Sequence, residues 1–264
     1  MEEKTAISFA NVAARYDGTP DILTDVSFNI SNGGFYFLSG ASGAGKTTLL
    51  RLIYQLHKPA RGQIKLFGQP TNNMTRDEIT KLRQKMAIVF QEYSLLSHLS
   101  VFDNVALPLR VRGISEAKIK KLVNKVLDWV GLGKYASANP KSLSGGQQQR
   151  VSVARAIIVQ PSILLADEPT GNLDDEIASR LMELFIQMNK MFGTTIILAT
   201  HNKKLMETYQ FPVIRVSDHR VSFTGQSTNT TTKTDSEPKK IWRGPKPQNY
   251  FTELSKQFDD IGNA

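Results

Sequence analysis

Four short segments of the chain are apolar at nearly every position instead of alternating between apolar and polar residues. They are Phe35 to Leu38, Ala87 to Phe90, Ile163 to Ala166 and Thr195 to Ala199. Strands that are apolar on both faces are typical of a parallel sheet covered by helices. Small or polar residues follow each segment, as expected where the carboxyl ends of strands face a ligand crevice. The pattern therefore predicts an α/β fold with an open, mainly parallel sheet.

Two further patterns divide the rest of the chain. Before about residue 68, shorter stretches such as Val26 to Ile30 alternate between apolar and polar residues and predict an additional antiparallel subsheet. Between about residues 93 and 160, apolar residues recur at helical spacing, most clearly in the segment that Ser115 caps and Gly131 ends. We expect one domain over residues 1–225, with a helical subdomain at about 93–160.

The C-terminal residues 226–264 differ in composition from the rest. Ser, Thr and Asn dominate residues 226–240, where apolar side chains are almost absent. Such a segment buries too little surface to offset the entropy cost of ordering it, so we predict a polar, disordered tail. Within it, Tyr250 to Leu254 is either a docking segment or a frayed end.

Composition narrows the cellular setting. The chain has 264 residues, a formal net charge of +9 and no cysteine, which excludes disulfides and Cys-based metal or redox sites. No apolar run approaches the roughly 20 residues that span a bilayer, and the acidic start, Met1 to Lys4, does not resemble a signal peptide. These features predict a cytosolic location. The positive net charge has three possible explanations: a basic surface in contact with solvent, attraction to anionic lipid at the cytoplasmic leaflet, or attraction to nucleic acid. Net charge alone does not distinguish them.

A glycine-rich run directly follows the first buried segment and matches the phosphate-loop pattern G-x-x-x-x-G-K-[ST]. Its residues are Gly40, Ala41, Ser42, Gly43, Ala44, Gly45, Lys46 and Thr47. The glycines let backbone N–H groups turn around a phosphate, and the helix that continues through Thr48 adds its positive N-terminus. Lys46 would reach the β- and γ-phosphates, and the Thr47 hydroxyl would ligate Mg²⁺. The run therefore predicts a site for a nucleoside triphosphate with magnesium.

Two carboxylates follow the third buried segment. Asp167 ends that strand and would hold the Mg²⁺ shell, and Glu168 lies one residue further on. Glu168 is placed to polarise a water that attacks the γ-phosphate. Taken alone, an Asp-Glu pair after an apolar strand is weak evidence for a nucleotide-hydrolysing site. Because the same chain contains a phosphate loop, the pair becomes strong evidence for such a site.

A second helix start has the features of an anion site. Ser144, Gly145, Gly146 and Gln147 open a helix that runs through Arg150 towards Pro161. Small residues leave the positive N-terminus of this helix open, and the serine adds a hydroxyl. The chain thus has two helix ends suited to phosphate, one at Lys46 and one at Ser144.

The run Leu143 to Arg150 resembles the signature of the ATP-binding-cassette family, and the other motifs of that family follow in order. The resemblance implies a P-loop NTPase cassette with a RecA-like mixed-sheet core, an antiparallel β-subdomain and an α-helical signature subdomain. It implies that Tyr16 stacks on adenine and that Gln91 touches Mg²⁺ and senses a membrane partner. It also implies that His201 contacts the γ-phosphate, and that residues 169–174 form the loop at a dimer seam. His57, His98 and His219 match no motif and are interpreted as structural.

The family resemblance further implies how the protein works. Two copies would form a head-to-tail homodimer, with each ATP between the phosphate loop of one copy and the signature helix of the other. Closing and opening of the pair would drive an integral membrane subunit, which places the protein at the cytoplasmic face of the membrane.

Within the family, the chain resembles the small cassettes of lipoprotein release, macrolide-type export and cell division. Residues 100–109, with Asp175, look most like the FtsE division cassettes. That family pairs with the membrane protein FtsX and acts indirectly on cell-wall hydrolases. Gln147 and Asn202 depart from the usual residues of division cassettes, so lipoprotein release or export remains the alternative. A nucleic-acid ATPase is disfavoured, because the span from Lys46 to Ser144 is too short for the coiled-coil insertion of such relatives, and no nucleic-acid partner is expected.

Overall fold

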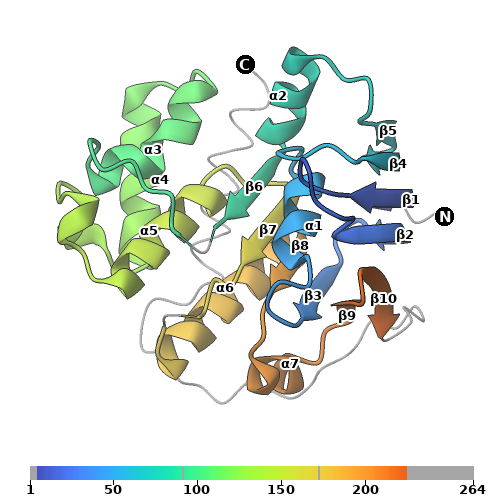
Figure 1. Cartoon of the computed structure of the whole chain (residues 1–264). Coiled ribbons are helices and arrows are strands. Elements are labelled where there is room, and N and C mark those ends of the chain that lie inside the picture. Colours follow the sequence, from blue (N-terminus) through green and yellow to red (C-terminus); the bar gives the residue numbers. More distant parts are fainter. Residues whose placement is uncertain (1–4, 91, 172, 225–264) are drawn as a thin grey trace. The chain divides into compact units, whose positions relative to one another are not determined.

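The computed structural model describes residues 5–90, 92–171 and 173–224, which fall into two compact units (Figure 1). Unit 1 comprises residues 5–90, 161–171 and 192–224. Unit 2 comprises residues 92–160 and 173–191. The two units are described in turn.

The main sheet of unit 1 has six strands. In spatial order they are β10 (Arg220–Thr224), β9 (Val213–Ser217), β3 (Phe35–Gly40), β8 (Thr195–Ala199), β7 (Ile163–Asp167) and β6 (Met86–Val89). All neighbouring pairs are parallel except β10 with β9. The four apolar segments of the sequence form β3, β6, β7 and β8, which confirms the predicted α/β fold with a largely parallel sheet.

A second sheet of unit 1 is antiparallel and has four strands. Its spatial order is β2 (Leu23–Ser31), β1 (Thr5–Ala14), β4 (Arg61–Leu66) and β5 (Gln69–Pro70). Side chains alternate between buried and exposed along β2, as its sequence pattern predicts. The additional antiparallel subsheet is therefore confirmed.

Helix α1 (Lys46–Ile53) joins the hydrophobic cores of the two sheets. Leu49, Leu50, Leu52 and Ile53 are almost fully buried, and they belong to one apolar cluster that includes residues of both sheets. Complete burial of one such side chain contributes about 1.5–3 kcal/mol. The start of this helix is thereby fixed with respect to the strand ends. Unit 1 also contains α2 (Arg76–Gln84) and α7 (Lys203–Tyr209).

Unit 2 is helical. Its helices are α3 (Val101–Val111), α4 (Glu116–Trp129), α5 (Gly145–Ile157) and α6 (Asp175–Phe192), with short 3-10 helices at Gly133–Tyr135 and Pro140–Ser142. The helix predicted after Ser115 is α4, and it buries the apolar face that the spacing indicated. Ser115 occupies the cap position, but its side chain accepts no capping hydrogen bond.

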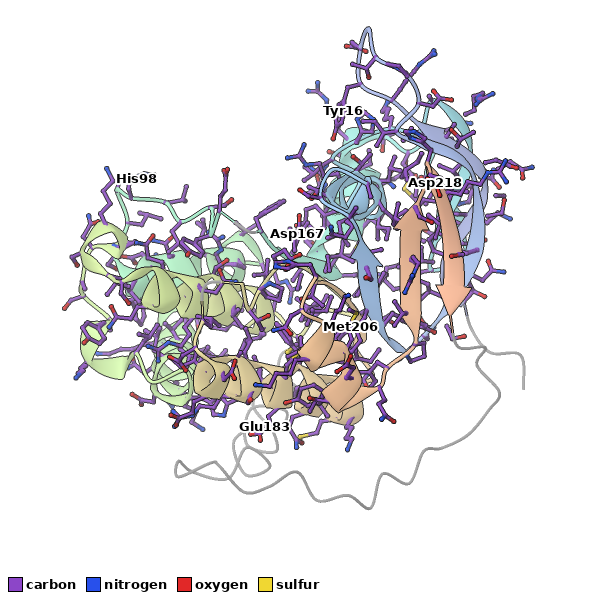
Figure 2. The ribbon with its side chains drawn as sticks, turned by 60° about the horizontal axis from the view of Figure 1, so that its bottom comes forward. Tyr16, His98, Asp167, Glu183, Met206 and Asp218 are labelled. Atoms are coloured by element: carbon purple, nitrogen blue, oxygen red, sulfur yellow. The ribbon has the colours of Figure 1, made fainter. Side chains whose placement is uncertain are left out.

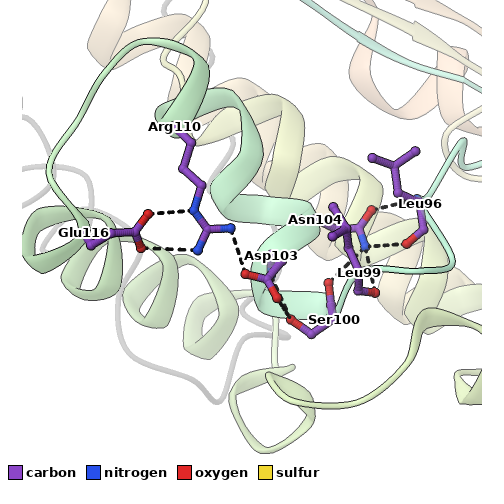
Figure 3. A network of polar contacts seen from close by, with 7 residues as sticks. All are labelled: Leu96, Leu99, Ser100, Asp103, Asn104, Arg110 and Glu116. Atoms are coloured by element: carbon purple, nitrogen blue, oxygen red, sulfur yellow. Dashed lines mark hydrogen bonds and ion pairs between the residues drawn. The ribbon is translucent and has the colours of Figure 1, made fainter.

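A polar network organises the start of α3 (Figure 3). Asn104 is fully buried, and its side-chain amide donates to the carbonyls of Leu96, Leu99 and Ser100, while its oxygen accepts from the Leu96 N–H at 2.8 Å. One side chain thus fixes the loop that precedes α3.

Charged groups extend this network on the surface of unit 2. Arg110 binds Asp103 at 2.8 Å and Glu116 at 2.7 Å, and so joins α3 to the first turn of α4. Hydrogen bonds from Ser100 and Arg110 lower the pKa of the Asp103 carboxyl, and Arg110 lowers the pKa of Glu116. The polar residues of the run at residues 100–109, which resembles the division cassettes, therefore also stabilise the start of α3 and its connection to α4.

Replacing Asn104 with alanine should destabilise unit 2. The change leaves several buried backbone groups of the 96–100 loop without partners, and we expect a loss of about 3 kcal/mol in the free energy of unfolding. Urea titration followed by circular dichroism measures it. Asn124→Ala, at an exposed position of α4, is the control and should change stability little. Equal midpoints for the two variants would contradict the role given to Asn104.

Three sequence predictions lie outside the described residues. They concern the absence of a signal peptide at Met1 to Lys4, the role of Gln91, and the polar tail at 226–264. Across the part of the chain that the structure describes, no helix is long and apolar enough to cross a membrane.

Candidate functional site

A cavity of about 650 Å³ lies at the carboxyl ends of the parallel strands in unit 1. The side chains and loops that line it come from segments far apart in the sequence. They are Tyr16, Ile22, Gly40, Ala41, Ser42, Gly43, Gly45, Lys46, Thr47, Thr48, Asp167, Glu168 and His201. The structure therefore brings together most of the predicted site residues of this unit.

The loop between β3 and α1 requires glycine. Gly45 is the N-cap of α1 and has a φ of 108°, in the region that side chains disfavour. A Cβ added there would lie 3.1 Å from Leu23 Cδ2 and 3.2 Å from Ile22 Cγ2. No side chain caps α1 and no acidic residue lies in its first turn. The first N–H groups of the helix are thus left to a ligand, as an anion site requires.

Lys46 is folded back on its own loop. Its ammonium donates to the carbonyl oxygens of Gly40 at 2.8 Å and Ala41 at 3.0 Å. These contacts hold a positive charge at the cavity wall. The side chain of Ala44 packs against the hydrophobic core, and its N–H donates to the Ala41 carbonyl at 3.2 Å; its contact with a nucleotide stays a prediction.

The two predicted magnesium ligands of unit 1 are in direct contact. Thr47 Oγ1 donates to Asp167 Oδ2 at 2.7 Å, and Asp167 is only 5% exposed. A hydroxyl and a carboxylate are hard oxygen donors, and Mg²⁺ is commonly bound by one or two carboxylates together with substrate phosphates. No group of three His, Asp or Glu side chains suited to a metal occurs among the described residues. The residues present thus fit a magnesium ion whose remaining ligands are water and a bound polyphosphate.

Glu168 and His201 form a pair. His201 Nδ1 lies 2.8 Å from Glu168 Oε1, and the glutamate side chain is only 12% exposed whereas the histidine is 75% exposed. Because an ionised carboxylate can only accept hydrogen bonds, Nδ1 carries the proton in this contact. The sequence predicts Glu168 near the γ-phosphate, and the family resemblance implies the same for His201; the structure adds that the two side chains contact each other.

Glu168 also has an unusual backbone. Its φ is 48°, a left-handed conformation that costs a non-glycine residue about 1 kcal/mol or more. Its N–H donates to the Ala199 carbonyl at 3.0 Å, and its carbonyl accepts from Gly171 at 3.2 Å. These contacts hold the turn that follows β7 and direct the Glu168 carboxylate towards His201.

Sheet order explains why these groups meet. Strand β8 lies between β3 and β7, so the His201 segment lies between the glycine-rich loop and Glu168. Backbone bonds continue beyond the strands, from Thr200 N–H to the Leu38 carbonyl at 3.0 Å and from Glu168 N–H to Ala199. Parallel strands end at one edge of the sheet, which makes that edge the site.

Tyr16 lies at another wall of the cavity, in the loop between β1 and β2 (Figure 2). Its side chain is 36% exposed, and its hydroxyl lies 3.5 Å from Thr48 Oγ1. An exposed aromatic face beside a phosphate loop can stack on a nucleobase. The geometry is therefore compatible with the predicted adenine contact.

The residues of the predicted signature motif lie at the start of α5, in unit 2. Ser144 is the N-cap of α5, its hydroxyl accepts from Gln147 N–H at 3.3 Å, and Gln147 Oε1 accepts from Ser144 N–H at 2.8 Å. The sequence did not anticipate this reciprocal capping box. The first turn carries no acidic residue, and Ser144 and Gly145 are exposed, so the helix end can receive an anion.

Some residues at the cavity were not predicted as contacts from the sequence. Ile22 and Ala41 line it, and Arg51, outside the lining, donates to the Tyr16 hydroxyl at 3.3 Å. Ala41 occupies a variable position of the phosphate-loop pattern, and no chemical pattern marks Ile22 or Arg51. Gln91, a predicted metal contact, lies outside the described residues.

Comparison with known proteins decides the family. The ABC transporter family profile matches residues 23–171, more than half of the chain. The chain belongs to the ABC transporter family. It is an ABC-type ATPase.

Curated relatives and solved cassettes agree with this assignment. The cell division ATP-binding protein FtsE of Escherichia coli (strain K12) is 41% identical over 212 residues, which cover 80% of this chain and 95% of the relative. FtsE of Bacillus subtilis (strain 168) is also 41% identical, over 80% of this chain and 92% of the relative. The dimeric post-hydrolysis structure of the cassette MJ0796, bound to ADP and Pi, has a TM-score of 0.77 at 34% identity, and the match covers 82% of this chain and 96% of the MJ0796 chain.

Proposed function

We propose that this cassette is the ATPase subunit of an FtsE-type complex that acts in cell division. The observation that carries the proposal is the 41% identity to FtsE across 95% of the length of that relative. Residues 1–225 would form the ATPase domain. The alternative is the ATPase of a lipoprotein-release or export complex. Because it hydrolyses ATP with the same chemistry, the residues of the nucleotide site do not distinguish the two roles, and an experiment in cells is needed.

ATP is the substrate, and the residues of unit 1 have distinct roles towards it. The free N–H groups at the start of α1 and the Lys46 ammonium would bind its phosphates, while Tyr16 would stack on adenine. Thr47 and Asp167 would hold Mg²⁺, which supplies charge neutralisation at the phosphates when bound. Gln91 is proposed as a further contact to this ion.

Glu168 is the proposed general base. Its carboxylate would accept a proton from the attacking water, a role that requires a fixed orientation. The hydrogen bond from His201 Nδ1, at 2.8 Å, supports that orientation, and so does the backbone turn after β7. His201 would thus act both on Glu168 and at the γ-phosphate.

Two copies of the cassette are proposed to close around ATP. The exposed N-terminus of α5, with Ser144, Gly145, Gly146 and Gln147, would bind the phosphates held by the other copy. The MJ0796 neighbour, described as dimeric, supports this arrangement. An FtsX-like membrane subunit would receive the motion, which places the cassette at the cytoplasmic face of the membrane.

Depletion in the cells that make the protein tests the biological role. We expect filamentous or chained cells, observed by microscopy, and restoration of division by the wild-type gene but not by a Glu168→Gln variant. Lipoproteins stranded in the inner membrane, with normal division, would instead assign the cassette to lipoprotein release and contradict the proposal.

A further inference from the structure

Tyr16 is held from two directions by residues of α1 and the turn that follows it. The ring centroid of His57 lies 4.7 Å from that of Tyr16, with the planes inclined by 42°. Arg51, in the last turn of α1, donates from Nη1 to the Tyr16 hydroxyl at 3.3 Å. The position of the tyrosine ring is thus set by the helix that starts at the phosphate loop.

His57 is itself fixed. Its Nε2 lies 3.0 Å from the carbonyl oxygen of Arg15, the residue before Tyr16, and must carry a proton because a carbonyl only accepts. The backbone N–H of His57 donates to the Arg51 carbonyl at 3.3 Å. Side chain and backbone together tie the Tyr16 loop to the end of α1.

The loop adds its own restraints. Both the N–H and the hydroxyl of Thr19 donate to the Tyr16 carbonyl, at 3.1 Å and 2.9 Å, and Ile22 N–H donates to the Ala14 carbonyl at 2.7 Å. These bonds shape the backbone of the hairpin. The direction of the Tyr16 side chain depends on its contacts with His57 and Arg51 and on the longer contact, at 3.5 Å, between its hydroxyl and Thr48 Oγ1.

Of the two rings, the tyrosine ring belongs to the wall of the proposed nucleotide cavity and the histidine ring does not. Tyr16 lines the cavity, whereas His57 is not among the described residues that line it. His57 therefore contacts the tyrosine without lining the cavity, while the Tyr16 side chain, 36% exposed, lines it. An aromatic platform that is already immobilised loses less entropy when a ligand stacks on it.

We propose that His57, with Arg51, is a positioning residue for nucleobase recognition, which makes the affinity for the base depend on a histidine outside the known motifs. This inference rests on the proposed ATP site and specifies how that site distinguishes ATP from a bare polyphosphate. The phosphates would be held at the start of α1, where Lys46 lies, and the base by Tyr16, which is positioned by Arg51 in the last turn of α1 and by His57 in the turn that follows.

The test compares a ligand that has a base with one that lacks it. Calorimetry measures binding of a non-hydrolysable ATP analogue and of inorganic tripolyphosphate, both with Mg²⁺, to the full-length chain. For His57→Ala we expect affinity for the ATP analogue to fall roughly three- to tenfold, the range of one aromatic contact. Affinity for tripolyphosphate should stay at the wild-type value.

Matched variants separate positioning from general structure. His57→Phe keeps an aromatic ring behind Tyr16 and should restore most of the lost affinity, while Lys58→Ala, at the exposed neighbouring position, should match wild type. In steady-state assays His57→Ala should raise KM for ATP and leave kcat near its wild-type value. Once Tyr16 is replaced by alanine, adding His57→Ala should cause no further loss.

Several results would overturn the inference. One is an ATP affinity of His57→Ala equal to that of Lys58→Ala, and another is an additive loss in the Tyr16→Ala background. Equal loss of ATP and tripolyphosphate binding would indicate damage to the phosphate loop instead of the base platform. A wild-type protein that binds neither ligand would overturn the proposed ATP site itself and the inference with it.

Discussion

Glu168→Gln should nearly abolish ATP turnover while ATP binding persists. Loss of a positioned general base reduces the rate by about 10²–10⁴-fold. The substitution keeps a side-chain oxygen that can accept the hydrogen bond from His201 Nδ1, so the geometry of the pair is retained. Phosphate release measures the rate, and size-exclusion chromatography with ATP should reveal accumulated closed dimers.

The control for this variant is Glu207→Gln, because Glu207 is an exposed carboxylate on α7 of the same unit. It should hydrolyse ATP at the wild-type rate. A Glu168→Gln protein that also does so would remove Glu168 from the mechanism.

Lys46→Ala should abolish productive nucleotide binding. A charge-assisted contact between ammonium and phosphate is among the stronger polar interactions, and its loss should weaken ATP affinity by roughly 10–100-fold or more. The fold should persist, because in the structure the ammonium binds only loop carbonyls of Gly40 and Ala41 among the described contacts. Calorimetry with ATP and Mg²⁺ measures the affinity, and circular dichroism checks the fold.

Lys65→Ala, an exposed lysine of β4, is the matched charge control. Both variants lower the net charge equally, so a purely long-range electrostatic effect would weaken binding in both. Retained affinity in Lys46→Ala would mean that the phosphates bind elsewhere.

Much of the fold could be predicted from the sequence because the relevant signals are local. Segments that are apolar at nearly every position predicted β3, β6, β7 and β8. Alternating apolar and polar residues predicted β2 in an antiparallel sheet. The phosphate loop was predictable too, since its glycines are required by backbone angles such as the φ of 108° at Gly45. These features depend on a few neighbouring residues.

The remaining features depend on contacts between distant segments, which sequence spacing does not encode. The Glu168–His201 bond joins residues after two strands that happen to be neighbours in the sheet. The left-handed turn at Glu168 occurs at a residue type that rarely adopts it, so no composition signal marked it. His57 was interpreted as structural for the same reason, because its relation to Tyr16 exists only in three dimensions.

The strand order of the main sheet also limits how this enzyme can vary. Because β8 is bonded on both sides, to β3 and β7, a one-residue slip of its register would turn its side chains to opposite faces of the sheet and displace the segment that carries His201. Chain length between strands has no such consequence. The 73 residues that separate Val89 of β6 from Ile163 of β7 can change in number without altering the spacing between neighbouring strand ends, about 4.8 Å, which sets the distance scale of the reacting groups. The groups at the strand ends are therefore spaced by the hydrogen-bonding repeat of the sheet, and insertions leave that spacing unchanged wherever they leave the repeat intact.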